Sequence, residues 1–205
     1  MSSKILEKLR EEQRTINHYY SKEAEEYDKQ MDMCHEMPDA REKLFENLGI
    51  KRGNLVIEGG VGTGKNFKFY PYGAKYFAVD INPDMLDKAR RKALNIRPKP
   101  KPVISNAREL CFPDSCFDIG ILTYALSGMP GNSEVLSEME RVVKKHGKIG
   151  VLDFAKAGSY PEGGFAHLSL KNLLSKRKRS EVIFNWNYLT ATSVREYGIY
   201  VLKVL

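Results

Sequence analysis

Residues 58–64 form a glycine-rich turn of the kind that can hold a charged ligand. The apolar run Leu55–Ile57 ends at Glu58, and glycines follow at positions 59, 60, 62 and 64. Glycine has no Cβ atom, so the backbone N–H groups of such a turn can approach an anion closely. We expect a helix to follow, and its N-terminus would offer further unpaired N–H groups.

Three ligand chemistries use a strand followed by such a turn, and the neighbouring residues distinguish between them. The spacing from Gly59 to Lys65 fits a phosphate-binding loop, but Asn66 stands where that loop needs a hydroxyl group to bind magnesium. The dinucleotide fingerprint fits worse, because its third glycine would fall at Lys65. The pattern E-x-G-x-G-x-G, which suits S-adenosylmethionine, matches from Glu58 to Gly64. A glycine-rich turn without a ligand is the remaining alternative.

A carboxylate follows the next apolar segment at a spacing that suits a ribose. Residues 76–79 predict a second short strand, which ends at Asp80, 20 residues after Gly60. In an α/β sheet this aspartate would lie at the carboxyl end of the neighbouring strand and could accept hydrogen bonds from both ribose hydroxyls. Asn82 and Pro83 then predict the cap and first residue of a helix. Because an aspartate after a strand is often a cap or turn residue, the argument depends on the two segments together.

Hydrophobic periodicity predicts an α/β chain. We expect a helix over residues 3–30, another over 39–49, and then an alternation of strands and helices. This alternation predicts a parallel sheet with helices on both faces. Residues 97–102 predict a stiff connector, and 158–165 predict a loop near the ligand edge. The remaining expected elements are strands 54–58, 76–80, 102–105, 117–123, 148–154, 181–187 and 198–204, and helices 83–94 and 133–145.

Length and composition favour one globular domain in the cytoplasm. The chain has 205 residues, of which 42% are apolar and 29% are charged. It has no run of 18 apolar residues that would predict a membrane-spanning helix, and its N-terminus lacks the apolar core of a signal peptide. Cys34, Cys111 and Cys116 are too few for a disulfide framework, and ordinary thiols are favoured over a soft-metal site. We therefore expect no metal.

The positive charge is concentrated near the C-terminus. The net charge is +7, and residues 165–205 hold seven Lys or Arg against two Glu. The densest part is the run Lys176–Arg179. Such a run is usually a solvated helix end or loop. The functional alternatives are contact with an anionic membrane surface or with an RNA backbone, and charge alone does not choose between them.

These segments together resemble a known family. The stretches 58–64 and 78–86 look like the first two motifs of class I S-adenosylmethionine-dependent methyltransferases, and the similarity continues through 106–118 and 138–149. Residues 19–28 are similar to the tyrosine-containing N-terminal helix of the ubiquinone/menaquinone-biosynthesis branch. Residues 60–66, followed by Phe69–Pro71, look most like those of bacterial phosphatidylethanolamine N-methyltransferases and of methyltransferase-like thiol/lipid-droplet proteins. The resemblance covers about residues 15–155.

The resemblance implies a fold and a reaction. The fold would be Rossmann-like, with a mostly parallel seven-stranded sheet whose last strand is antiparallel and with helices on both faces. A single domain would comprise an N-terminal helical cap (1–50), a cofactor-binding core (51–155) and a substrate-side loop with the final strands (156–205). S-adenosylmethionine would donate a methyl group to a small molecule or lipid headgroup, leaving S-adenosylhomocysteine. The alternatives are an RNA methyltransferase that uses the basic C-terminal stretch and a non-catalytic S-adenosylmethionine-binding protein.

The resemblance also implies roles for individual residues. The glycine turn would receive the methionyl carboxylate, Glu58 would hold the turn or the ligand's ammonium group, and Asp80 would bind the ribose. Ile81 and Met85 would sandwich the adenine, whose edge would meet Asn106 and the backbone of Ala107. The expected cofactor-binding residues are Tyr19, Tyr27, Glu58, Gly59, Gly60, Gly62, Gly64, Asn66, Asp80, Ile81, Met85, Asn106, Ala107 and Thr123.

The residues indicate less about the molecule that would accept the methyl group. Segment 123–130 lacks the (Asn/Asp)-Pro-Pro-(Tyr/Phe) signature of enzymes that methylate exocyclic base amines, and it has no Pro-Cys nucleophile. Its apolar character suits a small or lipidic acceptor, and a lipidic one would suit peripheral membrane contact through Lys176–Arg179. Tyr19, Tyr124 and His18 are candidates for orienting a nucleophile or taking its proton, with core packing or solvent exposure as the alternative for each.

Overall fold

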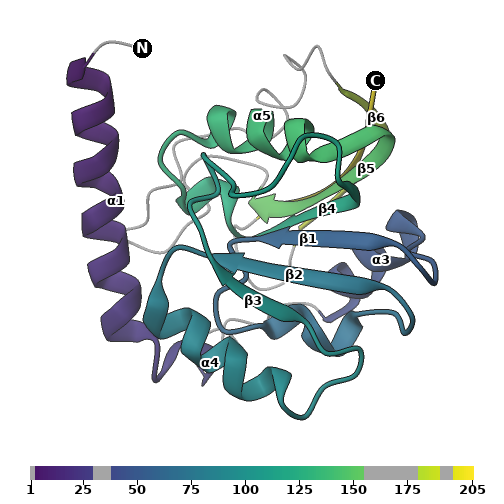
Figure 1. The fold of residues 1–205 in the computed structure, drawn as a ribbon, viewed down its shortest axis with the longest axis horizontal. Coiled ribbons are helices and arrows are strands. Elements are labelled where there is room, and N and C mark those ends of the chain that lie inside the picture. Colours follow the sequence, from purple (N-terminus) through teal and green to yellow (C-terminus); the bar gives the residue numbers. More distant parts are fainter. Residues whose placement is uncertain (1–2, 30–37, 155–179, 190–195) are drawn as a thin grey trace.

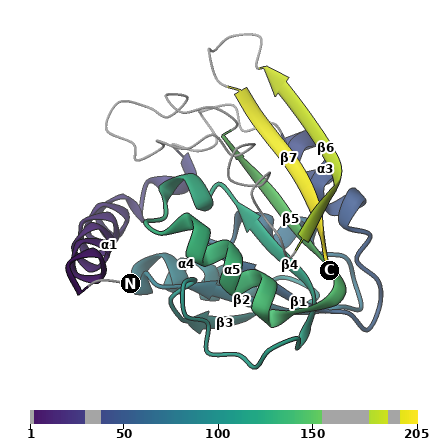
Figure 2. The same cartoon turned by 90° about the horizontal axis from the view of Figure 1, so that it is seen from above.

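A central sheet with helices on both faces organises the protein (Figures 1 and 2). The structure is a computed structural model that describes residues 3–29, 38–154, 180–189 and 196–205. Its helices are α1 (Ser3–Glu23), α3 (Pro38–Leu48), α4 (Pro83–Ala93) and α5 (Asn132–Val142), with short 3-10 helices η1 (Lys65–Phe69) and η2 (Leu126–Gly128). Its strands are β1 (Leu55–Gly59), β2 (Lys75–Asp80), β3 (Lys101–Ile104), β4 (Phe117–Thr123), β5 (Val143–Phe154), β6 (Ser180–Leu189) and β7 (Glu196–Val204).

The strand order creates a crevice at the middle of the sheet. The seven strands follow the order β3-β2-β1-β4-β5-β7-β6. Strands β1 to β5 are parallel, whereas β7 lies antiparallel to both β5 and β6. The chain moves outward in one direction from β1 to β3 and in the other from β4 onward. Ligands of open α/β sheets bind beyond the carboxyl ends of the strands at such a switch point.

Successive side chains of the parallel strands lie in two separate apolar layers, one on each face of the sheet. Val56, Ala78 and Ile121 point to the layer covered by α3, η1 and α4. Ile57 and Val79 belong to the opposite layer, which α5 covers. This alternation follows from the two-residue period of a strand, and burial on both faces explains why the strands read as continuous apolar runs. The rigid sheet therefore fixes the position of every loop at its carboxyl edge.

The predicted fold class is confirmed: the sheet is mostly parallel, helices cover both faces and the final strand is antiparallel. The predicted strands of the core and of the C-terminal part all appear, with boundaries shifted by at most two residues except at the start of β5. The division of the domain into a helical cap, a core and a substrate-side segment stays a prediction. No helix among the described residues is long and apolar enough to cross a membrane.

Three predicted elements differ from the structure. The predicted helix 133–145 ends at Val142, because Val143 already pairs with Phe117 and begins β5. The helix predicted over 3–30 is continuous only to Glu23. The helix expected after the glycine turn is the five-residue 3-10 helix η1. The predicted loop 158–165, Cys34 and the run Lys176–Arg179 lie outside the described residues.

Helix α3 supplies a large part of one apolar layer, so truncating its buried side chains should destabilise the fold. Leu44 is fully buried, and its Cδ1 atom approaches Gly150 of β5 closely enough to leave no room for a side chain there. We expect Leu44→Ala to lower the free energy of unfolding by about 2–5 kcal/mol. Leu94→Ala, at a residue that is 62% exposed, should change it by less than about 0.5 kcal/mol. Urea unfolding of both variants gives the comparison, and equal effects would contradict this packing.

Candidate functional site

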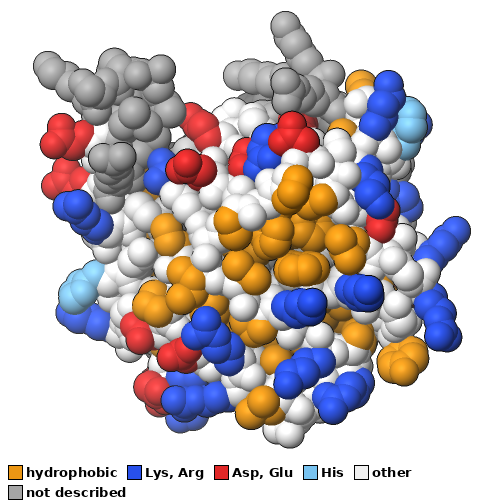
Figure 3. All heavy atoms as spheres, in the orientation of Figure 1, with side chains coloured by type: hydrophobic (Ala, Val, Ile, Leu, Met, Phe, Trp, Pro, Cys, Tyr) orange, Lys and Arg blue, Asp and Glu red, His pale blue; other side chains and the backbone are white. Residues whose placement is uncertain are grey.

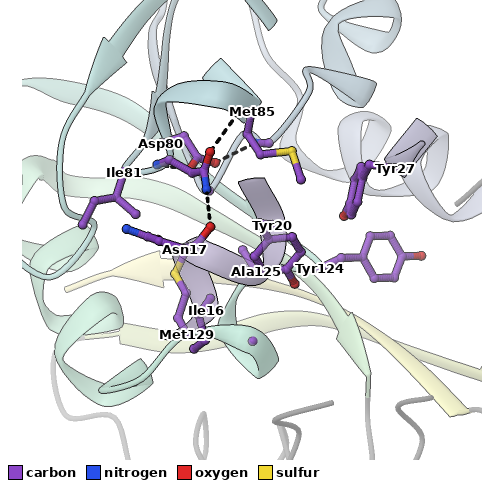
Figure 4. Close-up of a pocket in the computed structure, with 14 residues that line it drawn as sticks. Ile16, Asn17, Tyr20, Tyr27, Asp80, Ile81, Met85, Tyr124, Ala125 and Met129 are labelled. Atoms are coloured by element: carbon purple, nitrogen blue, oxygen red, sulfur yellow. Dashed lines mark hydrogen bonds between the residues drawn. The ribbon is translucent and has the colours of Figure 1, made fainter. Parts of the chain in front are cut away.

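A narrow pocket lies beyond the carboxyl ends of β1, β2 and β4, where the strand order reverses (Figure 4). Its volume is about 80 Å³. Helix α1, the glycine turn, the start of α4 and the segment after β4 surround it, so its walls come from parts of the chain far apart in sequence. The lining residues are Ile16, Asn17, Tyr20, Tyr27, Gly60, Gly62, Asp80, Ile81, Asn82, Met85, Tyr124, Ala125, Gly128 and Met129.

A second hollow of about 20 Å³ extends the pocket toward the end of β3. It shares Gly60, Asp80, Ile81 and Met129 with the first pocket. Its other lining residues come from α1, from the segment after β3 and from the start of α5, and they are Gln13, Ser105, Asn106, Ala107, Arg108, Pro130 and Val135. Together the two hollows suit an elongated ligand that passes across the ends of β1 and β2.

The glycine turn needs glycine for two physical reasons. Gly60, Gly62 and Gly64 all have positive φ, at 67°, 54° and 80°, a region that residues with a side chain rarely adopt. A Cβ atom on Gly60 would also lie 2.5 Å from Cε of Met129 and 2.8 Å from Cβ of Ala125. The backbone at Gly60 is thus in close contact with the segment after β4, and a side chain there would fill the pocket.

Asp80 connects the end of β2 to the glycine turn. Its carboxylate accepts hydrogen bonds from the backbone N–H of Gly62 at 2.7 Å and of Asn82 at 2.9 Å. Burial raises the pKa of the Asp80 carboxyl, and these two backbone hydrogen bonds oppose the rise. Each carboxylate oxygen can accept more than one hydrogen bond, so the group can hold the turn and still bind a hydroxyl in the pocket.

Asn82 joins the pocket to two helices at once. Its side-chain oxygen accepts hydrogen bonds from the backbone N–H groups of Asp84 and Met85, both at 3.0 Å, and so caps α4. Its amide nitrogen donates to the carbonyl of Asn17 at 2.9 Å and to the hydroxyl of Ser21 at 3.1 Å. Of these bonds, Figure 4 draws those that reach Met85 and Asn17. They hold α1 against the open side of the pocket.

Aromatic side chains line the side of the pocket next to α1. Tyr20 and Tyr27 contact each other edge to face, with ring centroids 6.0 Å apart, and Tyr124 lies beside them (Figure 4). Tyr19, which we expected at the cofactor, is 54% exposed and does not line the pocket. Tyr20 lines the pocket instead, because Ile16 and Tyr20, four residues apart, lie on the face of α1 that is turned toward the pocket.

A network of buried polar side chains lies beneath the glycine turn. The Tyr70 hydroxyl donates to Glu58 at 2.5 Å, and the Asn66 amide donates to Glu58 at 2.9 Å and to the Thr123 hydroxyl at 2.7 Å. Arg41 of α3 donates to the side-chain oxygen of Asn66. This network connects the turn with β4, η1 and α3, and all of its members are buried.

Three of the expected cofactor-binding residues belong to this network. Glu58, Asn66 and Thr123 do not line the pocket, and their side chains support the turn from below. For Glu58, this matches the first of the two roles that we expected. Burial raises the pKa of Glu58 to about 7, although hydrogen bonds from Tyr70 and Asn66 and the charge of Arg41 oppose the rise. Burial and the neighbouring Glu58 also raise the pKa of Tyr70.

Arg41 is a site residue that the sequence analysis missed. Its guanidinium carbon lies 4.9 Å from the centroid of the Tyr124 ring, and the residue is 6% exposed. It therefore contacts both the wall of the pocket and the network beneath the turn. A single arginine near the start of the helix predicted over 39–49 carries no signal of burial in the sequence.

The expected residues thus fall into separate groups. Tyr124 is the only one of the three candidate proton acceptors in the pocket, since His18 and Tyr19 are exposed. Gly59 is buried against Leu122 and Met139, and Gly64 lines a different hollow behind the turn. The expected cofactor residues that line the pocket are Tyr27, Gly60, Gly62, Asp80, Ile81 and Met85, and Asn106 and Ala107 line its extension.

Known proteins share the fold of this chain and the sequence pattern of its core. Residues 57–151 match the family model described as a methyltransferase domain. An S-adenosylmethionine-dependent methyltransferase from Aquifex aeolicus has a TM-score of 0.64 at 20% identity, over 80% of this chain and 89% of that one. One from Methanosarcina mazei has a TM-score of 0.62 at 19% identity, over 76% and 94%. The expected class I methyltransferase fold is confirmed, and residues 57–151 at its core are similar to methyltransferase domains.

Two curated relatives with similar sequences are both named as methyltransferases. The phosphatidylethanolamine N-methyltransferase of Cereibacter sphaeroides is 33% identical over 129 residues, which are 62% of this chain and 62% of that protein. The ubiquinone/menaquinone biosynthesis C-methyltransferase of Cupriavidus taiwanensis is 31% identical over 137 residues, which are 64% of this chain and 56% of that protein. The chain spans about three fifths of the length of these relatives.

The raised pKa of Glu58 predicts a dependence of stability on pH. The folded protein binds this proton more tightly than the unfolded chain, because the pKa rises from 4.5 to about 7 on folding. Stability should therefore fall as the pH rises from about 4.5 through about 7. We expect the wild type to lose on the order of 1–3 kcal/mol more over this range than Glu58→Gln, which has no charge to bury.

Urea unfolding at a series of pH values measures this difference. Glu42→Gln removes a carboxyl group from an exposed position of α3 and should keep the profile of the wild type. Parallel pH profiles for the wild type and Glu58→Gln would contradict the assignment of the proton to Glu58.

Proposed function

We propose that this protein transfers the methyl group of S-adenosylmethionine to a small molecule or a lipid headgroup. The observation that carries the proposal is the position of Asp80. Its carboxylate lies at the carboxyl end of β2 and lines both hollows, with the glycine turn on one side. A carboxylate at this point of an α/β sheet suits the hydroxyl groups of a ribose.

The residues of the site fit S-adenosylmethionine from one end to the other. Asp80 would accept hydrogen bonds from the ribose hydroxyls. Ile81 and Met85 offer apolar contacts for the adenine, and Asn106 offers a side-chain amide in the adjoining hollow. The backbone of the glycine turn would meet the methionyl carboxylate. Pockets that combine apolar walls with a few well-placed polar groups are typical of cofactor sites.

The protein's own contribution to methyl transfer would be alignment and the exclusion of water. The bound donor supplies a methyl group on a positively charged sulfur, which a nucleophile attacks in line. Holding the two reactants in this geometry can account for about 7–11 kcal/mol of a barrier. Tyr20 and Tyr27 cover the pocket from the N-terminal segment, and Tyr124 faces them from the end of β4. Tyr124 is the candidate for orienting the nucleophile or accepting its proton.

Two observations support a small or lipidic acceptor. The wall next to the three tyrosines is apolar, with Ala125, Gly128 and Met129 from the segment after β4. The curated relatives are named for phosphatidylethanolamine and for ubiquinone and menaquinone. Peripheral contact with an anionic membrane through Lys176–Arg179 stays a prediction, as does the weaker alternative of contact with nucleic acid, because this run lies outside the described residues.

A labelled-methyl transfer screen tests the proposal. Purified protein is incubated with S-adenosylmethionine that carries a labelled methyl group and with phosphatidylethanolamine, quinol precursors, thiols or RNA. We expect transfer to a lipid or small molecule and none to RNA. Binding of S-adenosylhomocysteine without transfer to any acceptor would contradict an enzyme, and transfer to RNA alone would support the RNA methyltransferase instead.

The role of Asp80 can be tested by removing its charge. We expect Asp80→Asn to weaken S-adenosylhomocysteine binding by about 1.5–3 kcal/mol, the scale of hydrogen bonds to a charged group. Asp84→Asn changes an exposed carboxylate four residues later, in the first turn of α4, and should leave the affinity unchanged. Isothermal titration calorimetry on both variants gives the two values, and equal affinities would remove Asp80 from the donor site.

The two neighbouring tyrosines of α1 provide a matched pair for testing the wall of the pocket. Tyr20 lines the pocket, whereas Tyr19 is 54% exposed. We expect Tyr20→Ala to weaken S-adenosylhomocysteine binding by about 0.5–1.5 kcal/mol through the loss of aromatic contacts. Tyr19→Ala should bind like the wild type in the same calorimetric assay. The reverse pattern would show that α1 presents its other face to the ligand.

A further inference from the structure

Arg108 is an arginine whose side chain lies in the wall of the candidate site. Lys and Arg side chains stand out on the surface of the face in Figure 3, as is usual for these residues. Arg108, by contrast, lines the second hollow, which extends the pocket toward the end of β3. Its Nε atom is buried and has no hydrogen-bond partner among the described residues. Because buried polar atoms in folded proteins nearly always have a partner, this N–H indicates a group that the protein does not itself supply.

No acid pairs with Arg108 within the described part of the chain. Asp80 is the only acid among the described residues that line the second hollow, and its carboxylate accepts hydrogen bonds from the backbone N–H groups of Gly62 and Asn82. The ion pairs of the described residues do not include Arg108. A guanidinium has N–H donors and no acceptor, so Arg108 presents only donors to the hollow.

The backbone that carries Arg108 is held in place by the sheet. The N–H of Ser105 donates to the carbonyl of Asp80 at 3.1 Å, which continues the pairing of β3 with β2. The N–H of Arg108 donates to the side-chain oxygen of Asn106 at 3.0 Å, and the N–H of Glu109 donates to the Asn106 carbonyl at 2.9 Å. The turn after β3 therefore has a fixed shape, and a donor that is already in place loses less entropy when a ligand binds.

Packing also fixes the side chain of Arg108. A Cβ atom on Gly131, which precedes α5, would lie 2.9 Å from Cδ of Arg108 and 3.3 Å from Oε2 of Glu134. The arginine stem thus packs against the backbone at Gly131, and the next atom along the stem is the buried Nε. Glu134 forms no ion pair with Arg108, although both side chains are described. The position of Nε is therefore set by contacts with the protein backbone and not by an acid.

A purine base offers acceptors that match such a donor. The ring nitrogens of adenine accept hydrogen bonds, and its exocyclic amine is its donor group. The second hollow shares Gly60, Asp80, Ile81 and Met129 with the pocket. A ligand whose ribose is bound at Asp80 can thus extend its base into the second hollow, where Arg108 would meet the base.

We propose that Arg108 recognises the adenine of the methyl donor by donating a hydrogen bond to one of the ring nitrogens. This inference rests on the proposed function, because it takes the bound donor as the ligand, and it adds a residue that selects the base. A base with C–H in place of that nitrogen would leave the buried donor of Arg108 without a partner. Sites built to hydrogen-bond a ligand discriminate strongly against analogues that lack the bonding group.

Calorimetry with the full chain tests the role of Arg108. The ligands are S-adenosylhomocysteine and the analogues in which C–H replaces one ring nitrogen of adenine, N1, N3 or N7. Arg108→Met keeps an unbranched stem without donors, and Arg108→Lys keeps the charge without the buried N–H. The control, Arg91→Met, removes an exposed arginine of α4 that lines neither the pocket nor the second hollow. Urea unfolding verifies that all variants fold.

We expect the wild type and the control to bind S-adenosylhomocysteine alike, and both Arg108 variants to bind it about tenfold more weakly. One analogue should bind the wild type about tenfold more weakly than S-adenosylhomocysteine does. The same analogue should lose no further affinity in Arg108→Met, because the hydrogen bond is already missing. A purely structural role of Arg108 would instead lower the affinity for all of the ligands by the same factor.

Such a uniform loss would overturn the inference. Unchanged binding of S-adenosylhomocysteine by Arg108→Met, or full affinity in Arg108→Lys, would overturn it as well. All three results leave the proposed function intact, because the wild type still binds S-adenosylhomocysteine. If the wild type does not bind S-adenosylhomocysteine at all, the proposed donor site fails and the role of Arg108 fails with it.

Discussion

The hydrogen bond from the Gly62 backbone to the Asp80 carboxylate is the interaction on which the site depends. It joins the turn after β1 to the end of β2, the two strands between which the pocket opens. Since Gly62 has a positive φ, the turn can present its N–H to the carboxylate only in a conformation that glycine adopts easily. The Asp80 carboxylate thus holds the turn and also faces the pocket, so a single group serves both the fold and the site.

A carboxylate that both holds the turn and faces the pocket has to be buried at the end of an apolar sheet. Glu58 and Asp80 end neighbouring parallel strands, and burial raises the pKa of both. The protein offsets the unfavourable desolvation with hydrogen-bond donors: backbone N–H groups for Asp80, and Tyr70 and Asn66 for Glu58. Tyr70 and Asn66 are held in the apolar layer below the turn, so the stability of that layer and the geometry of the pocket are linked.

The sequence predicts the fold well, because the fold depends on local patterns, and several of the residues that it singles out line the pocket. Apolar runs mark the strands, and the spacing from Gly60 to Asp80 reflects one β-turn-β unit. Side-chain direction is less predictable. Tyr19 and Tyr20 are adjacent tyrosines, and only the helical phase set by Ile16 and Ala24 separates them. Arg41 could not be found, since its burial depends on partners 25 and 82 residues away.

Asn82 divides its two ends between two tasks. Its oxygen caps α4 inside the core, while its nitrogen holds α1 over the pocket. If one atom of the side chain had to bond to both helices in turn, opening of the pocket would be coupled to fraying of α4. Here separation of α1 would break the two hydrogen bonds of the amide nitrogen, each worth about 0.5–1.5 kcal/mol, and would expose the buried Ile16, while α4 keeps its cap. Exchange of a bulky ligand would then need no local unfolding of the sheet layer that forms the floor of the site.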